Sequence, residues 1–187
     1  MRMFVGLYPP EHVVDALEDF LEPRRDAEAL RWSPPEMFHI TLAFCPDVPE
    51  HRLDDLGERL AAMGARHTPF TLRLSGGGTF PDPDRAKLLY AAVDADESSS
   101  AALHSLAQGS RNAAVASGLE VAGGPYRPHV TLARSNRGFS AMRWLRVLDA
   151  FESATWTVDE FHLVQSHLGE GSHRRPRYEI IATVPIA

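Results

Sequence analysis

Two short stretches, His39-Ile40-Thr41-Leu42 and His129-Val130-Thr131-Leu132, decide the fold of this 187-residue chain. Each begins with histidine, carries threonine two residues later and is followed by alanine. Side chains alternate between the two faces of a strand, so histidine and threonine share one face while the two apolar residues share the other. Each stretch therefore predicts a strand that buries one side and presents a polar side.

The same order of elements surrounds both stretches, which indicates two similar halves. Ser75 to Asp84 holds three consecutive glycines and two prolines, a composition that predicts a loop between the halves. We expect an α+β fold: one domain over residues 1–187, in two lobes formed by residues 1–80 and 81–187. Each lobe is predicted to be a mostly antiparallel sheet with helices outside, and the two sheets to line a central cleft about a pseudo-twofold axis. Periodicity predicts strands at 3–8, 39–44, 70–74, 88–93, 129–134, 156–164 and 178–185. It also predicts four helices: one opened by Pro9-Pro10 and ended by Pro23, one through 53–63 closed by Gly64, one that follows the capping segment 96–99 and ends at Gly118, and a short one around 144–148.

Composition limits the classes of function. The formal net charge of −6 repels nucleic acid, so a polyanion would need a local cationic site. No run approaches the roughly 18 apolar residues of a membrane helix. Cys45 is the only cysteine, which excludes an intrachain disulfide and a cysteine-based zinc cluster. We expect a soluble, cytoplasmic protein with no membrane partner.

The polar faces of the two strands suit acid–base chemistry. If the lobes pack about a twofold axis, His39 and His129 oppose each other across the cleft. One imidazole can then accept a proton while the other donates one, as phosphodiester hydrolysis requires. Thr41 and Thr131 lie on the same faces, where their hydroxyls can donate to phosphate oxygens. Arg134 can add a bidentate contact to phosphate, but strict alternation turns it toward the core, so it must lie at the end of its strand.

Metal and nucleotide-loop chemistry is not indicated. The chain has no H-E-x-x-H or similar compact ligand set, and each stretch pairs one imidazole with a threonine, which is a poor zinc ligand. Gly76 to Gly78 lacks the G-K-[ST] ending of a phosphate-binding loop. We expect no metal and no cofactor.

The two H-[I/V]-T-L stretches, with Pro128 before the second and Arg134 after it, resemble the 2H phosphoesterase superfamily, specifically the LigT-like RNA 2′,3′-cyclic phosphodiesterases, also called 2′-5′ RNA ligases. Two such motifs in register are a specific signal, whereas one would recur by chance. The similarity spans nearly the whole chain. It implies a LigT-like fold and metal-independent hydrolysis of an RNA or nucleoside 2′,3′-cyclic phosphate to a 2′-phosphate, with reverse 2′-5′ ligation as a secondary activity.

The resemblance also implies roles. His129 would activate water and His39 would protonate the departing 3′ oxygen, although the order of base and acid stays open. Thr41, Thr131 and Arg134 would hold the phosphate. Base recognition in such enzymes relies on stacking, and the candidate residues here are Phe80, Tyr126 and Trp32.

Two other functions stay open at this stage. The substrate can instead be a small cyclic nucleotide or ADP-ribose 1″,2″-cyclic phosphate, since both carry the same five-membered ring. The chain can also be a non-catalytic module that binds a nucleotide or RNA end, although two complete motifs favour an enzyme. The expected partner is an RNA end or small nucleotide with a cyclic phosphate, and the expected state is a monomer.

Overall fold

The chain forms one nine-stranded sheet in the order β7-β4-β5-β6-β3-β1-β8-β9, with the short strand β2 also paired to β6. All pairs are antiparallel. The computed structural model describes every residue from 1 to 187. The strands are β1 (Met3–Leu7), β2 (Arg31–Trp32), β3 (Ile40–Cys45), β4 (Phe70–Phe80), β5 (Ala86–Asp94), β6 (His129–Phe139), β7 (Trp156–Val158), β8 (Glu160–His167) and β9 (Arg177–Pro185).

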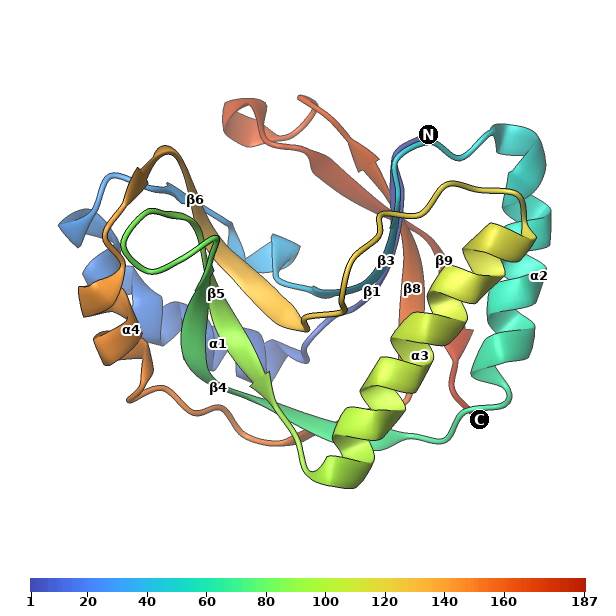
Figure 1. Cartoon of the computed structure of the whole chain (residues 1–187), viewed down its shortest axis with the longest axis horizontal. Coiled ribbons are helices and arrows are strands. Elements are labelled where there is room, and N and C mark those ends of the chain that lie inside the picture. The colour runs from blue at the N-terminus through green and yellow to red at the C-terminus, as the bar shows by residue number, and fades with distance from the viewer.

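The chain has four α-helices, and they flank the sheet in two pairs (Figure 1). Helix α3 packs on β3 and on α2, and α2 also packs on β9, whereas α4 packs on β4. We call β1, β3, β8 and β9 with α2 and α3 the β3 half, and β2 and β4 to β7 with α1 and α4 the β6 half. The helices are α1 (Glu11–Leu21), α2 (Leu53–Gly64), α3 (Glu97–Ala116) and α4 (Met142–Leu148), with 3₁₀ turns η1 (Glu22–Ala27), η2 (Pro35–Met37), η3 (Glu50–Arg52) and η4 (Ser172–Arg174).

The two halves meet where β3 pairs with β6, and that pairing is a single residue pair, Ile40 with Val130. The expected α+β architecture of antiparallel strands with helices outside is confirmed, and the two expected sheets are the two halves of one continuous sheet. Because paired residues point to the same face, both apolar residues enter the core and both polar motif faces lie side by side on the other surface. The motif strands are thus neighbours at the centre of the sheet.

The glycine-rich stretch is strand up to Phe80, which corrects the loop predicted over residues 75–84 for its first part, while residues 81–84 form the turn between β4 and β5. Strand β4 continues through Gly77 and Gly78 to Phe80 and pairs with β5. A Cβ on Gly78 would lie 2.2 Å from the Tyr90 hydroxyl, and one on Gly77 would lie 2.4 Å from Leu148. These glycines therefore allow neighbouring side chains to approach the backbone of a strand, which is one use of glycine within a sheet.

The predicted division into lobes 1–80 and 81–187 is wrong, because residue 80 lies inside the β4–β5 hairpin of the β6 half. The chain crosses between the halves several times. Strands β1 and β3 belong to the β3 half, β4 belongs to the β6 half, α3 then returns to pack on β3, and α4 lies again in the β6 half, where it packs on β4. The strand predicted over 156–164 is also two strands, since β7 pairs with β4 and β8 pairs with β1.

Buried apolar side chains from both halves form one cluster of 39 residues. The faces of α1 and α2 that carry Leu17, Leu21, Leu56 and Leu60 are fully buried in it, as their spacing of three and four residues predicts. No helix is both long enough and apolar enough to cross a membrane.

Candidate active site

A β-bulge turns Arg134 onto the polar face of β6. Tyr90 of β5 faces Thr131 while the preceding residue, Leu89, faces Ala133, so Leu132 is an extra residue on β6. Leu132 and Ala133 are consequently both buried, and alternation resumes with Arg134 on the side of the histidine. A bulge commonly re-aims a side chain in this way. Arg134 therefore reaches the cleft from mid-strand, which corrects the expectation that β6 must end there.

The first motif carries the same bulge. Gly6 of β1 faces Thr41 while Val5 faces Ala43, so Leu42 is the extra residue on β3. Phe44 lies on the polar face of β3 at the position equivalent to that of Arg134 on β6. The guanidinium carbon of Arg2 lies 4.5 Å from the centre of the Phe44 ring. The β3 half thus also presents a cation, but the cation comes from the neighbouring chain segment and stacks on an aromatic ring.

Each motif histidine is anchored by its own backbone. The Nδ1 atom of His39 lies 2.7 Å from the carbonyl oxygen of Met37, and that of His129 lies 2.6 Å from the carbonyl oxygen of Arg127. A carbonyl only accepts, so Nδ1 carries the proton in each ring and Nε2 is left as the free acceptor. The Thr41 hydroxyl lies 3.1 Å from Nε2 of His39 and donates to it. The two imidazoles therefore share one tautomer and one mode of orientation.

Aromatic side chains enclose His39. The Phe4 ring stacks on it at 4.4 Å with 23° between the planes, and the Tyr178 ring meets it edge-on at 5.4 Å. Burial lowers the pKa of His39 to about 4, and the positive charges of His129 and Arg134 act in the same direction. The hydrogen bond to Met37 opposes that shift. His39 is consequently neutral at pH 7 in the free protein.

His129 has a related but more open setting. Phe80 lies edge-on at 5.1 Å, and the Tyr90 ring lies at 5.2 Å. Burial lowers the pKa of His129, the bond to the Arg127 carbonyl raises it, and Arg134 lowers it. Nε2 of His129 has no hydrogen-bond partner in the chain, in contrast to Nε2 of His39.

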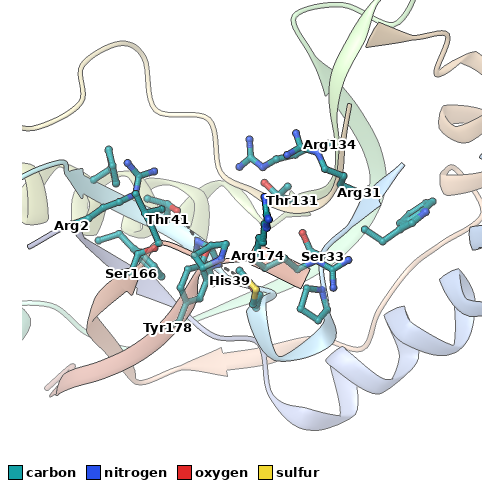
Figure 2. Close-up of a pocket in the computed structure, with 18 of the residues that line it drawn as sticks. Arg2, Arg31, Ser33, His39, Thr41, Thr131, Arg134, Ser166, Arg174 and Tyr178 are labelled. Carbon is teal, nitrogen blue, oxygen red and sulfur yellow. Dashed lines mark hydrogen bonds between the residues drawn. The ribbon is translucent and has the colours of Figure 1, made fainter. Parts of the chain in front are cut away.

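Both histidines line one cavity of about 670 Å³, which we call the main cavity. Figure 2 shows Arg2 on one side of His39, and Arg31 with Arg134 on the other. Arg174 and Arg175, from the segment between β8 and β9, also line the cavity. None of these five arginines has a carboxylate within 4.0 Å, and no acidic residue lines the cavity. A chain with net charge −6 thus concentrates unpaired positive charge at the histidines, as anion binding requires.

All five predicted site residues, His39, Thr41, His129, Thr131 and Arg134, line the main cavity together. Sequence reasoning missed four arginines there. Three of them carried a usable signal: Arg174 and Arg175 belong to the basic run Arg174-Arg175-Pro176-Arg177, and Arg31 precedes the first motif. Arg2 carried none, because only the β1–β3 pairing brings it over Phe44.

The three stacking candidates lie at different places. Trp32 lines the main cavity and meets Trp144 edge-on at 5.1 Å. Phe80 and Tyr126 line a second cavity that adjoins His129.

The structure shows no group of side chains that could hold a metal ion: nowhere in the chain do three or more His, Cys, Asp or Glu residues lie close enough together to form a ligand set.

Comparison with known proteins fits this arrangement. Residues 9–170 match the model of the 2′-5′ RNA ligase superfamily. The chain is 34% identical over 182 residues to the RNA 2′,3′-cyclic phosphodiesterase of Thermus thermophilus, covering 90% of this chain and 83% of that protein. It is 33% identical over 157 residues to the protein of the same name from Geobacillus stearothermophilus, covering 83% of this chain and 47% of that relative, so it spans about half of the latter's length.

Solved structures share the fold over the full chain. A crystal structure of a Thermus thermophilus protein superposes with a TM-score of 0.77 at 26% identity, covering 100% of this chain and 98% of that one. The E. coli LigT complex with 3′-AMP gives 0.78 at 22% identity, with the same two coverages.

An antiparallel sheet that sets two histidine–threonine strands side by side in a basic cleft defines a protein of the two-histidine phosphoesterase class. With the family match over most of its length, the chain belongs to the 2′-5′ RNA ligase superfamily.

Proposed function

We propose that this protein hydrolyses the 2′,3′-cyclic phosphate of RNA ends or nucleosides to a 2′-phosphate, without a metal ion, using His39 and His129. One observation carries the proposal: two imidazoles, each held at Nδ1 by a carbonyl two residues earlier, share a cavity with five unpaired arginines. The Thermus and Geobacillus relatives carry the name of this activity, which supports the same substrate class here.

In the proposed reaction His129 is the base and His39 the acid. Nε2 of His129 takes a proton from water while the water oxygen forms a bond to phosphorus. The bond from phosphorus to O3′ breaks in line, and Nε2 of His39 gives its proton to O3′. Nε2 of His129 makes no bond within the chain and is available to water, which favours this order. One proton is gained and one is lost, and exchange with solvent restores both rings.

The remaining residues stabilise the transition state in this scheme. Once Nε2 of His39 is protonated it no longer accepts from Thr41, so the hydroxyls of both Thr41 and Thr131 can donate hydrogen bonds to the non-bridging oxygens, where negative charge accumulates. Arg134 contributes a planar pair of donors suited to phosphate. The lowered pKa of His39 leaves it neutral in the free protein, so the phosphate anion must favour its protonation on binding.

The test is to incubate EDTA-treated protein with an oligoribonucleotide that ends in a 2′,3′-cyclic phosphate and to identify the position of the product phosphate. We expect a 2′-phosphate, an unchanged rate with EDTA, and a loss of at least ~10²-fold in kcat/KM for His39→Ala and for His129→Ala. The matched control is His51→Ala, an exposed histidine outside the cavity, for which we expect the wild-type rate.

Other results would contradict the proposal. A 3′-phosphate product would reverse the choice of leaving oxygen. Turnover that survives both histidine substitutions would remove the two-histidine mechanism. Absence of turnover on RNA and on nucleoside 2′,3′-cyclic phosphates, with activity on ADP-ribose 1″,2″-cyclic phosphate, would reassign the substrate.

A further inference from the structure

A third cavity, of about 390 Å³, adjoins the main cavity next to His39. The two cavities have five lining residues in common: Pro34, Met37, Arg175, Pro176 and Tyr178. Two of these residues contact His39, since the Met37 carbonyl accepts from its Nδ1 and the Tyr178 ring meets its imidazole edge-on (Figure 2). The third cavity therefore lies beside the histidine to which the proposed mechanism assigns the leaving oxygen.

The position of His39 decides on which side of the phosphate the rest of the substrate lies. In an in-line displacement the attacking water and the leaving O3′ stand on opposite sides of phosphorus. In the proposed mechanism His129 takes the proton of the water and His39 protonates O3′. Because O3′ belongs to the terminal ribose, that ribose and the chain joined to its 5′ carbon lie on the side of His39. The third cavity is on that side.

The wall of the third cavity suits a nucleoside. Tyr8 and Tyr178 contribute aromatic rings, and Ile180 is a large apolar residue that is 51% exposed. Tyr178 and Ile180 are two residues apart on β9 and share one face of that strand. Proteins that bind single-stranded nucleic acid without reading its sequence hold the bases on such aromatic and apolar surfaces. A base in this cavity would cover Ile180, which the chain itself leaves open.

The charges place an anion where the two cavities meet. Arg175 lines both cavities and has no carboxylate within 4.0 Å. Arg177 lines only the third cavity and is already paired, since its Nη2 lies 3.7 Å from Glu170. Glu36 lines the third cavity but not the main one, so its carboxylate repels a phosphate placed there. A phosphate is thus favoured at Arg175, with an uncharged group beyond it.

We propose that the third cavity binds the penultimate nucleoside of an RNA whose 2′,3′-cyclic phosphate lies at the two histidines, an inference that rests on the proposed function. Arg175 then pairs with the phosphate that links the last two nucleosides, and the penultimate base lies beside Tyr178 and Ile180. Groups follow one another along the substrate in the same order as their sites along the cleft. No bond forms or breaks beyond those of the proposed hydrolysis. The preferred substrate is therefore an RNA end of at least two nucleotides.

The test compares three substrates that differ by one group at a time. They are a nucleoside 2′,3′-cyclic phosphate, the same compound with a 5′-phosphate, and a dinucleotide that ends in a 2′,3′-cyclic phosphate. We expect kcat/KM to rise at each step and to be at least about 10-fold higher for the dinucleotide than for the nucleoside, since a charge-assisted contact and a base contact are added. Because the readout is a ratio of kcat/KM values, a general loss of activity in a variant cancels.

Two variants probe the two parts of the subsite. Arg175→Gln should lower the ratio of dinucleotide to nucleoside about 10-fold, the scale of a lost charge-assisted contact. Its matched control is Arg146→Gln, an exposed arginine on α4 outside the three cavities. Ile180→Asp should lower the same ratio at least about 5-fold, the scale of one lost base contact. Its matched control is Ile181→Asp, which adds the same charge at the adjacent exposed residue, outside the three cavities.

The outcomes separate the two proposals. If none of the three substrates yields a 2′-phosphate, the proposed function fails and the subsite fails with it. If all three are hydrolysed with equal kcat/KM, or if the ratio stays at its wild-type value in both Arg175→Gln and Ile180→Asp, the subsite alone is overturned. A fall of the ratio in Arg127→Gln, in the wall of the second cavity, with no fall in Arg175→Gln would place the upstream nucleotide beside His129 and also overturn it.

Discussion

The strands β3 and β6 carry the same motif and the same bulge, yet they present different residues at the equivalent position. On β6 the bulge brings Arg134 into the main cavity. On β3 it brings Phe44, which supports Arg2 from the chain preceding β1. The rings also differ in setting, since His39 is stacked on Phe4 and accepts from Thr41, while Nε2 of His129 is free. The repeated motif and bulge thus hold the two imidazoles in equivalent positions, and the residues around the two motifs give them different environments.

Among the substitutions that test this comparison, we expect the largest effect from a change at Arg134. In Arg134→Gln the phosphate loses a charge-assisted donor pair, which is worth about 1.5 to 3 kcal/mol, so kcat/KM should fall roughly 10- to 100-fold. Phe44→Leu keeps an apolar support below Arg2 and should cost only a few-fold. Steady-state kinetics on a cyclic-phosphate oligonucleotide checks both. The matched control is Arg137→Gln, on the same strand but outside the main cavity. If Arg137→Gln lowered kcat/KM as much as Arg134→Gln does, the claim that the bulge gives Arg134 a special role would be wrong.

A second prediction tests the glycines that admit the aromatic neighbours of the two histidines. A Cβ on Gly78 would meet the Tyr90 ring at 2.2 Å, whereas a Cβ on Gly6 would meet the Phe4 ring at 3.1 Å. Gly78→Ala should therefore lower the free energy of unfolding by about 1 to 3 kcal/mol, as overpacking does, and Gly6→Ala by less. Urea denaturation measures both. Gly57→Ala, in helix α2 with open space around it, should instead stabilise by about 0.5 to 1 kcal/mol, and equal losses at Gly78 and Gly6 would contradict the comparison.

The smallest effect concerns pH. The proposed mechanism needs one protonated and one neutral histidine, so kcat/KM falls when both rings are protonated and when both are neutral. The pKa of His39 is lowered to about 4 and that of His129 is also lowered, which places the maximum of kcat/KM below pH 6.5. A pH–rate profile on the free enzyme checks this. Titration of the two imidazoles by NMR should show both pKa values rising when inorganic phosphate is added, and an optimum above neutral pH would contradict the burial of His39.

The sequence predicted what depends on local alternation and on repetition. The H-x-T spacing was enough to place His39 and Thr41 on one polar face and to foresee four residues of the main cavity, the histidine and the threonine of each motif. The loop predicted over 75–84 was wrong for residues 75–80, because glycine composition does not distinguish a turn from a strand whose backbone is approached by a tyrosine ring. The side chain of Arg134 points into the cleft because of a bulge. That bulge is set by the pairing of β5 with β6 and not by the sequence of β6 alone.

The division into lobes failed for a related reason. Repetition of elements along the chain was real, but strands of one half are contributed by both parts of the chain, as β8 shows by pairing with β1. Arg2 entered the site only through such non-local pairing. Local periodicity carries no information about which strand becomes the neighbour of which.

The carbonyl anchors of His39 and His129 have an electrostatic consequence for the reaction cycle. Many enzymes orient a histidine with a buried carboxylate, which also stabilises the imidazolium. Here a peptide dipole orients each ring, and no fixed anion stands near the phosphate to repel it. The imidazolium then has no permanent counter-ion, so the substrate serves as one. In the proposed mechanism His39 carries the proton that it donates only while a phosphate occupies the cleft. In the empty site at pH 7 the ring is neutral and cannot act as the acid.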